Sequence, residues 1–161
     1  MIAEIEGFFF DAMVTRSWAK GTKALNIPGM PGWEAIKYED KGKGLKLVDR
    51  WGKDSRGTAV GSILITMQNV PAWVMWVGAE NPAQNYTKAA IPFLKKVLMG
   101  AYTNRVFKAG RGYHCETDHQ FIYLNQFEGD FAKFRGTEGI VDYPHNPTSV
   151  GTHKCWGGML I

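Results

Sequence analysis

The interval from Asn81 to Cys115 contains no Asp or Glu. Its cations are Lys88, Lys95, Lys96, Arg105, Lys108 and Arg111. Unopposed cations raise the local potential and attract anions. We therefore select Arg105, Lys108 and Arg111 for an anion site, because guanidinium groups donate in pairs and the neighbouring glycines let backbone N–H groups approach a phosphate. The alternative is a solvated basic helix face and loop, paired with acids elsewhere in the chain. We expect Arg111 to be an exposed charge, so Arg111→Ala should cost the fold less than about 0.5 kcal/mol, and Lys95, on the expected solvent face of the second helix, serves as the control.

Aromatic side chains supply a second set of candidates. Tryptophans fall on predicted strands at Trp33, Trp51, Trp73, Trp76 and Trp156. Trp73 and Trp76 cannot both face the core, because an odd spacing puts them on opposite faces of a strand. We expect Trp51, Trp76 and Tyr113 to offer flat surface to a planar anion beside Arg111, through stacking and charge. The alternative is that the tryptophans only pack the core.

Histidines and cysteines raise the question of metal or thiol chemistry. They fall in two groups, His114-Cys115 with His119, and His153 with Cys155. The spacing matches no standard zinc pattern, and adjacent residues on a strand point to opposite faces. A Cys–His nucleophile pair needs a thiol and a base within reach, which spacing alone does not establish. We expect no metal and no cofactor.

Carboxylates near the end of the chain offer a third type of chemistry. Glu128, Asp130 and Glu138 could form an acid–base cluster, but Glu128-Gly129-Asp130 is more simply a turn in which Gly129 has a positive φ. Glu138, which we include in the ligand site, could instead form a buried ion pair with Arg135 or Arg56.

Hydrophobic periodicity predicts the elements that position these residues. Helices are expected at 2–16 and near 87–99, the second starting at Ile91–Pro92 or kinked there, with Gly100 as its stop. Strands are expected at 33–38, 45–51, 57–67, 72–77, 113–116, 120–127, 131–134, 139–143 and 152–159. The order is helix, strands, helix, strands.

A weak internal repeat follows this order. Arg56-Gly57-Thr58 precedes Trp76 as Arg135-Gly136-Thr137 precedes Trp156, with a Pro-rich turn in the second copy. We expect one domain over 1–161, an α+β fold in which two helices pack on a curved antiparallel sheet. The repeat predicts a duplicated helix-plus-meander unit, with halves at about 1–80 and 81–161.

Composition sets the outer bounds. The 161 residues are 45% hydrophobic, and this fraction excludes a disordered chain. The net charge of +4 is far below that of a protein that coats DNA. Residues 57–79 are uncharged and long enough to cross a bilayer, but Gln68 and Asn69 at their centre favour a hairpin of two buried strands. With two cysteines and no signal peptide, a reduced cytoplasmic protein is expected.

Several segments resemble a bacterial domain family of unknown function. They are Leu47-Val48-Asp49-Arg50-Trp51-Gly52, Arg56-Gly57-Thr58, Pro71 to Gly78, Phe127 to Phe131, Phe134 to Glu138 and Trp156 to Leu160. Members of that family occur alone or fused to helix-turn-helix transcriptional regulators. The resemblance implies an α+β fold and a sensor-like role, and it brings no established activity. Ala59 and Val60 depart from the family, which usually has an acidic residue there.

The expectation is a non-catalytic protein that senses or sequesters a small anionic ligand, with a nucleotide as the leading example. Such a chain would fit phage or bacterial signalling or defence. Two alternatives remain, a hydrolytic or thiol-based enzyme that uses the His, Cys and Glu residues, and a protein-binding adaptor. We expect no membrane or nucleic-acid partner, and the oligomeric state is open, with a homodimer among the alternatives.

Overall fold

The computed structural model describes residues 1–143 and 148–161, and of Thr148 only the backbone. Its helices are α1 (Ile2–Thr15) and α2 (Ile91–Thr103), with a short 3-10 turn, η1 (Pro82–Gln84). Its strands are β1 (Leu25–Asn26), β2 (Glu34–Asp40), β3 (Leu45–Lys53), β4 (Ala59–Met67), β5 (Val70–Gly78), β6 (Cys115–Thr117), β7 (Phe121–Asp130), β8 (Lys133–Asp142) and β9 (Thr148–Met159).

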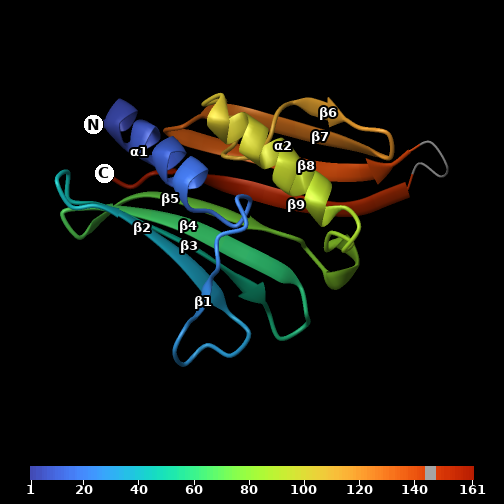
Figure 1. Ribbon diagram of the computed structural model, residues 1–161, viewed down its shortest axis with the longest axis horizontal. Coiled ribbons are helices and arrows are strands. Elements are labelled where there is room, and N and C mark those ends of the chain that lie inside the picture. Colours follow the sequence, from blue (N-terminus) through green and yellow to red (C-terminus); the bar gives the residue numbers. More distant parts are fainter. Residues whose placement is uncertain (144–147) are drawn as a thin grey trace.

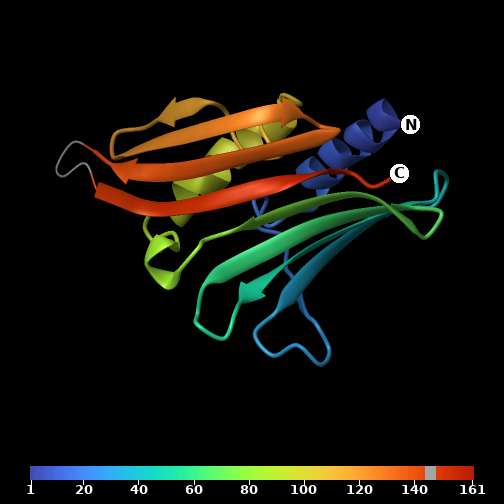
Figure 2. The same ribbon diagram turned by 180° about the vertical axis from the view of Figure 1, so that it is seen from behind.

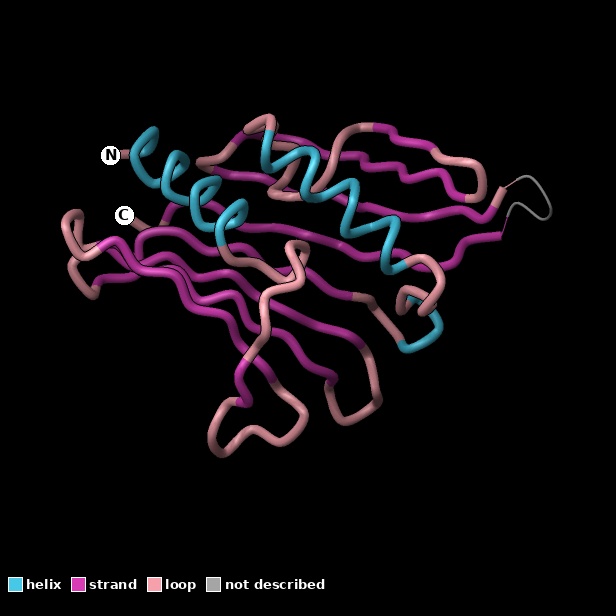
Figure 3. The backbone as a smooth tube through the Cα atoms, in the orientation of Figure 1, coloured by secondary structure: helices cyan, strands magenta, loops and turns pink. Residues whose placement is uncertain are grey.

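The described strands form one antiparallel sheet of nine strands in the order β1-β2-β3-β4-β5-β9-β8-β7-β6. The sheet twists strongly and stays open, and α1 and α2 lie next to each other against one face (Figure 1). The opposite face, seen in Figure 2, carries no helix in the described part of the chain. Figure 3 shows the loops gathered at the strand ends. The predicted α+β fold is confirmed.

Both helices form where apolar residues recur at helical spacing. In α1, Ile5, Phe9 and Met13 are buried, and the helix ends one residue before the predicted boundary. Helix α2 begins at Ile91 with Pro92 in its first turn, one of the two predicted alternatives.

Gly100 was expected to stop α2, and this prediction is wrong. The helix runs on to Thr103 because Ala101 and Tyr102 are buried against the core, which offsets the low helix propensity of glycine. Gly100 instead makes room for Tyr113, since a Cβ at this position would lie 3.3 Å from its ring.

The uncharged stretch forms the β4–β5 hairpin, as predicted. Gln68 and Asn69 occupy the turn with φ values of 52° and 66°, the left-handed conformation that two-residue hairpin turns require. No helix in the described residues is long and apolar enough to cross a membrane.

One pair of predicted strands is in fact a single strand. Segments 131–134 and 139–143 were expected to be separate, but β8 runs without interruption from Lys133 to Asp142. The polar stretch between them hides the strand, because Glu138 fills an inward position where alternation would otherwise place an apolar residue. Gly129 has the predicted positive φ of 87°, although the hairpin turn itself falls at Phe131-Ala132.

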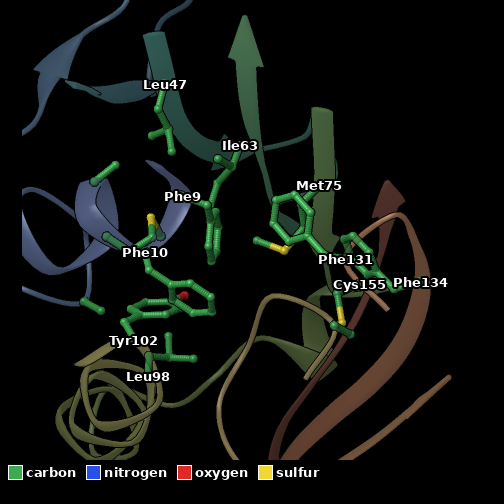
Figure 4. Packing of buried hydrophobic residues seen from close by; sticks show 14 of the residues in the cluster. Phe9, Phe10, Leu47, Ile63, Met75, Leu98, Tyr102, Phe131, Phe134 and Cys155 are labelled. Carbon is green, nitrogen blue, oxygen red and sulfur yellow. The ribbon is translucent and has the colours of Figure 1, made fainter. Parts of the chain in front are cut away.

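The core lies between the helices and the sheet and is centred on aromatic rings (Figure 4). Phe9 of α1 packs against Trp73, Tyr102 and Phe131, with ring centroids 5.2–6.0 Å apart. The indole N–H of Trp73 donates to the Phe131 carbonyl at 2.9 Å. The core thereby ties α1 to β5, to α2 and to the turn between β7 and β8.

The two halves of the chain meet where β5 pairs with β9. Trp76 lies directly opposite Trp156, and their side chains are 42% and 51% exposed on the helix-free face. Trp73 is fully buried, so the predicted division of Trp73 and Trp76 between opposite faces is confirmed. The internal duplication stays a prediction, to be tested by superposing the halves. Most of the Pro-rich turn of the second copy lies outside the described residues.

Candidate functional site

A cavity of about 360 Å³ opens between α2 and strands β3, β4 and β5. Much of its wall is apolar and includes Trp18, Trp51, Ile63, Val77, Leu94 and Leu98. Cavities of this size and composition hold small molecules in many proteins. The described structure thus contains a ligand-sized cavity on the helix-covered face of the sheet.

Strand alternation and one loop contact build this cavity. Along β3, the inward positions are Leu45, Leu47 and Asp49, followed by Trp51. The amide of Asn85 accepts from the Ala59 N–H at 2.8 Å and donates to the Gly57 carbonyl at 3.0 Å. These two bonds fasten the loop before α2 to β4. The loop residues Tyr86 and Lys88 therefore lie at the cavity.

Asp49 places a carboxyl group in this apolar wall. It is 9% exposed, and burial raises its pKa to about 6. A hydrogen bond with the backbone of Trp18 and the charge of Arg111 act in the opposite direction. Near neutral pH, Asp49 thus presents a poorly hydrated carboxylate to the cavity, which favours a hydrogen-bond donor as its partner.

Arg111 forms a buried ion pair beside the cavity. Its Nη2 donates to Glu138 Oε1 at 2.7 Å, and the Tyr123 hydroxyl donates to Glu138 Oε2 at 2.8 Å. Burial opposes the ionised form of Glu138, but the guanidinium charge and these hydrogen bonds hold its pKa below the usual value. Burial lowers the pKa of Arg111, but the charge and hydrogen bond of Glu138, together with the nearby Tyr102 and Tyr123, raise it above its usual range, so Arg111 is kept protonated. The pair is therefore ionised inside the protein.

Three polar atoms of cavity-lining residues are buried without a hydrogen-bond partner among residues 1–143 and 148–161. They are Arg111 Nε, His153 Nε2 and the Tyr86 hydroxyl, which lies close to the Glu138 carboxylate without a hydrogen bond of normal geometry to it. The ring centroids of Tyr86 and His153 lie 4.4 Å apart. Burial lowers the pKa of His153 to about 4, so its ring is neutral at pH 7. An unpaired buried polar atom costs about 1–3 kcal/mol. A ligand that satisfies these atoms would recover that cost.

Cations outnumber acids around the cavity. Asp49 is the single acid among the described lining residues, which also include Arg50, Lys53, Lys88 and Arg111. Lys53 and Lys88 are exposed, and neither forms an ion pair with a described residue. We call the part of the cavity lined by Lys53 and Lys88 its exposed end. The resulting positive potential there favours an anion.

Of the predicted site residues, the cavity contains Trp51 and Arg111, with Glu138 directly behind Arg111. Arg111 was expected to be an exposed charge, and this is wrong, because the side chain is 9% exposed and bound to Glu138. The partner expected for Glu138, Arg135 or Arg56, is also corrected to Arg111. Arg135 pairs instead with Glu128 on the surface.

The other predicted site residues lie elsewhere. Arg105 forms an ion pair with Asp11 of α1, and the Lys108 ammonium sits 4.5 Å from the centre of the Phe127 ring. Tyr113 packs against Gly100, and Trp76 is on the opposite face of the sheet. None of these four residues lines the described cavity.

Sequence reasoning missed Asp49 and Tyr86 and considered His153 only for metal or thiol chemistry. One available signal was the alternation Leu45, Leu47, Asp49, which puts a carboxyl group on an otherwise apolar face. No comparable signal marked Tyr86, because its loop is placed by long-range contacts, namely the Asn85 bonds and the Thr87 N–H that donates to the Val150 carbonyl.

The thiol groups are poorly placed for nucleophilic chemistry. Cys155 is buried, and burial raises its pKa to about 12, so it carries no thiolate near neutral pH. Cys115 is exposed on β6, which is separated from β9 by β7 and β8, or about 14 Å at the usual strand spacing. The sheet therefore keeps the two Cys/His groups apart.

The same separation predicts metal independence. Within the described part of the chain, no three His, Cys, Asp or Glu residues gather around a position that could hold an ion. We expect a chelator to leave the melting temperature unchanged and elemental analysis to find less than one equivalent of zinc. A stoichiometric metal that is lost together with stability on chelation would contradict this prediction.

Comparison with known proteins identifies the family. No curated protein and no solved structure matches the chain. The family model described as "Domain of unknown function (DUF5680)" matches residues 56–160. These residues include β4, β5, α2, β9 and the Arg111–Glu138 pair. Because this match covers more than half of the sequence, the chain belongs to the DUF5680 domain family.

Proposed function

We propose that this protein is a non-catalytic small-molecule-binding protein that takes an aromatic anion into the cavity and senses or sequesters it. The observation that carries the proposal is the set of unpaired buried polar atoms, on Tyr86, Arg111 and His153, inside an apolar-walled cavity. Buried polar groups normally have partners, so each exception calls for an explanation, and a bound ligand explains all three at once.

The walls and the charges favour the same class of ligand. Trp18 and Trp51 offer flat apolar surface, and Lys53 and Lys88 offer positive charge at the exposed end. A planar molecule with an anionic group gains from both, through stacking and through Coulomb attraction. A nucleotide has this chemistry. A sensor role agrees with the resemblance to domains fused to transcriptional regulators, whereas a free-standing chain would sequester its ligand.

One observation favours catalysis as the second candidate. Asp49, with a pKa of about 6, could exchange a proton with a bound molecule near neutral pH. Binding remains the first proposal, since the buried thiol of Cys155 is protonated and Glu138 is engaged by Arg111 and Tyr123. Recovery of each bound compound intact by chromatography supports binding, and conversion to a product supports the enzyme.

Filling the cavity is expected to abolish binding. Val77 of β5 lines the cavity, whereas Val74 lies on the opposite face of the same strand. Val77→Phe should weaken the binding of 8-anilinonaphthalene-1-sulfonate, an aromatic anion, and of any nucleotide that binds, by at least tenfold. Fluorescence titration and calorimetry measure both.

The matched control is Val74→Phe, which makes the same substitution on the helix-free face and should change affinity less than twofold. Equal losses in the two variants would mean that binding depends on general stability or on the outer surface. If neither the sulfonate nor any nucleotide binds the wild-type protein, the proposed function is wrong.

A further inference from the structure

The charges inside the cavity differ from those at its exposed end. In the interior, the positive charge of Arg111 is already neutralised by Glu138 at 2.7 Å, and Asp49 adds a second carboxyl group nearby. A phosphate or sulfonate placed there would meet the Asp49 carboxylate and a guanidinium whose charge Glu138 already compensates. Such a placement is unfavourable, because a buried charge needs an uncompensated partner.

The exposed end has the opposite character. Lys53 at the end of β3 and Lys88 before α2 are solvent-exposed and lack ion-pair partners among the described residues. An anionic group there keeps part of its hydration and gains two cations. A bound anion should therefore lie with its charge outward.

What remains inside is a set of directional hydrogen-bonding groups. Arg111 Nε–H has no acceptor among the described residues, the Asp49 carboxylate is an acceptor, and both residues line the same cavity. The Tyr86 hydroxyl and the neutral His153 ring add groups that can donate or accept. A donor and an acceptor in one cavity match an edge on which an N–H adjoins a carbonyl oxygen.

We propose that the ligand is a planar heterocycle with an amide-type edge, as in a nucleobase, that points this edge inward to Asp49 and Arg111 and leaves its phosphate at Lys53 and Lys88. This inference rests on the proposed function and adds to it the chemical class and the orientation of the ligand. The ring N–H donates to the Asp49 carboxylate, and Arg111 Nε–H donates to the ring carbonyl. Trp51 supplies flat wall beside the ring.

A series of fragments tests the orientation. The probes are nucleosides, their 5′-monophosphates, ribose 5-phosphate and 8-anilinonaphthalene-1-sulfonate, which has no amide-type edge. At least one nucleoside should bind, its monophosphate should bind roughly 3- to 30-fold more tightly, and ribose 5-phosphate should bind at least 100-fold more weakly than the monophosphate. In the double variant Lys53→Ala/Lys88→Ala, or at 0.5 M salt, the gain from the phosphate should disappear and nucleoside affinity should stay within twofold.

Asp49→Asn tests the inner edge. The amide has the same shape but no charge, so nucleoside affinity should fall at least tenfold, whereas binding of the sulfonate should stay within twofold of wild type. Asp40→Asn is the matched control, because Asp40 does not line the cavity and asparagine keeps an acceptor for the Lys43 N–H. This control should leave every affinity within twofold.

Different failures have different meanings. If the sulfonate binds in a Val77→Phe-sensitive manner but no nucleoside or nucleotide binds, the heterocycle assignment is wrong and the proposed function stands. If ribose 5-phosphate binds as tightly as the monophosphate, or if Asp49→Asn leaves nucleoside affinity unchanged, the inward orientation is wrong. If no probe binds, or if Val77→Phe has no effect on any probe, both the proposed function and this inference are overturned.

Discussion

Replacing Arg111 by alanine is expected to lower the free energy of unfolding by about 3–5 kcal/mol at pH 7, because it leaves the Glu138 carboxylate buried with no positive partner among the described residues. Urea unfolding followed by circular dichroism measures the change. The expectation from the sequence was a loss of less than about 0.5 kcal/mol, typical of an exposed charge. The two values differ because the guanidinium is buried and paired.

The choice of control also depends on the structure. Lys95 was expected from the sequence to face solvent on the second helix, but its ammonium lies 4.6 Å from the centre of the Trp18 ring. Lys96 is exposed, so Lys96→Ala is the better control and should cost less than about 0.5 kcal/mol.

Two further measurements identify the cause of the loss. Glu138 has a lowered pKa in the folded protein, so its ionised form contributes stability above about pH 4.5, the ordinary value, and this contribution is lost as the pH falls through the folded-state pKa. The difference between wild type and Arg111→Ala should therefore shrink in acid. Arg111→Met combined with Glu138→Leu should recover most of the stability at pH 7. A loss that is independent of pH and is not recovered by the double variant would contradict the ion-pair explanation.

Asp49→Asn is expected to stabilise the unliganded protein at pH 7. The pKa of Asp49 rises from 3.8 to about 6 on folding, so the folded state binds the proton more tightly than the unfolded state. Wild-type stability from this group therefore falls as the pH rises from about 4 to 6, and the penalty is complete above pH 6. A shift of this size corresponds to about 3 kcal/mol, which asparagine avoids.

Unfolding of wild type and Asp49→Asn between pH 4 and 8 measures this effect. The advantage of the variant should be small at pH 4 and reach about 2–3 kcal/mol at pH 7. His153 acts in the opposite sense over part of this range because its pKa is lowered on folding, but it is present in both proteins and cancels in the difference. The control is Asp40→Asn, which should not be more stable than wild type at pH 7, because Asp40 does not line the cavity. An advantage that is equal at pH 4 and pH 7 would contradict a raised pKa at Asp49.

These two predictions together bear on function. A carboxylate that destabilises the unliganded fold is the kind of residue that proteins retain for binding or catalysis. If Asp49→Asn stabilises the protein and weakens nucleoside binding, the same group is responsible for both effects.

Local patterns in the sequence were sufficient for most of the elements. Helical spacing in Ile5, Phe9 and Met13 predicted α1, and Gln68-Asn69 predicted the β4–β5 turn. Strand alternation required Trp73 and Trp76 to take opposite faces, which they do. Each of these predictions depends on residues within a few positions of one another, where backbone geometry alone determines which side chains share a face.

The candidate site was only partly predictable. The acid-free interval led to Arg111, and the strand pattern led to Trp51, both of which line the cavity. The same interval also led to Arg105 and Lys108, because charge counting along the chain cannot tell which cations meet acids from distant segments. Asp11 lies 94 positions from Arg105 and pairs with it.

The sequence by itself determined the helices, most hairpins and the positions that face inward. Only the tertiary structure decided that β5 and β9 are neighbours, that Glu138 approaches Arg111 across 27 positions and that the Asn85 loop lies on β4 at the cavity. The reason is that these contacts join segments far apart in the chain, and they form only when the whole sheet is assembled and its core is packed. The charges and unpaired donors of the cavity follow from that assembly, because burial and partners, rather than residue type, set whether an arginine binds a ligand or a neighbouring glutamate.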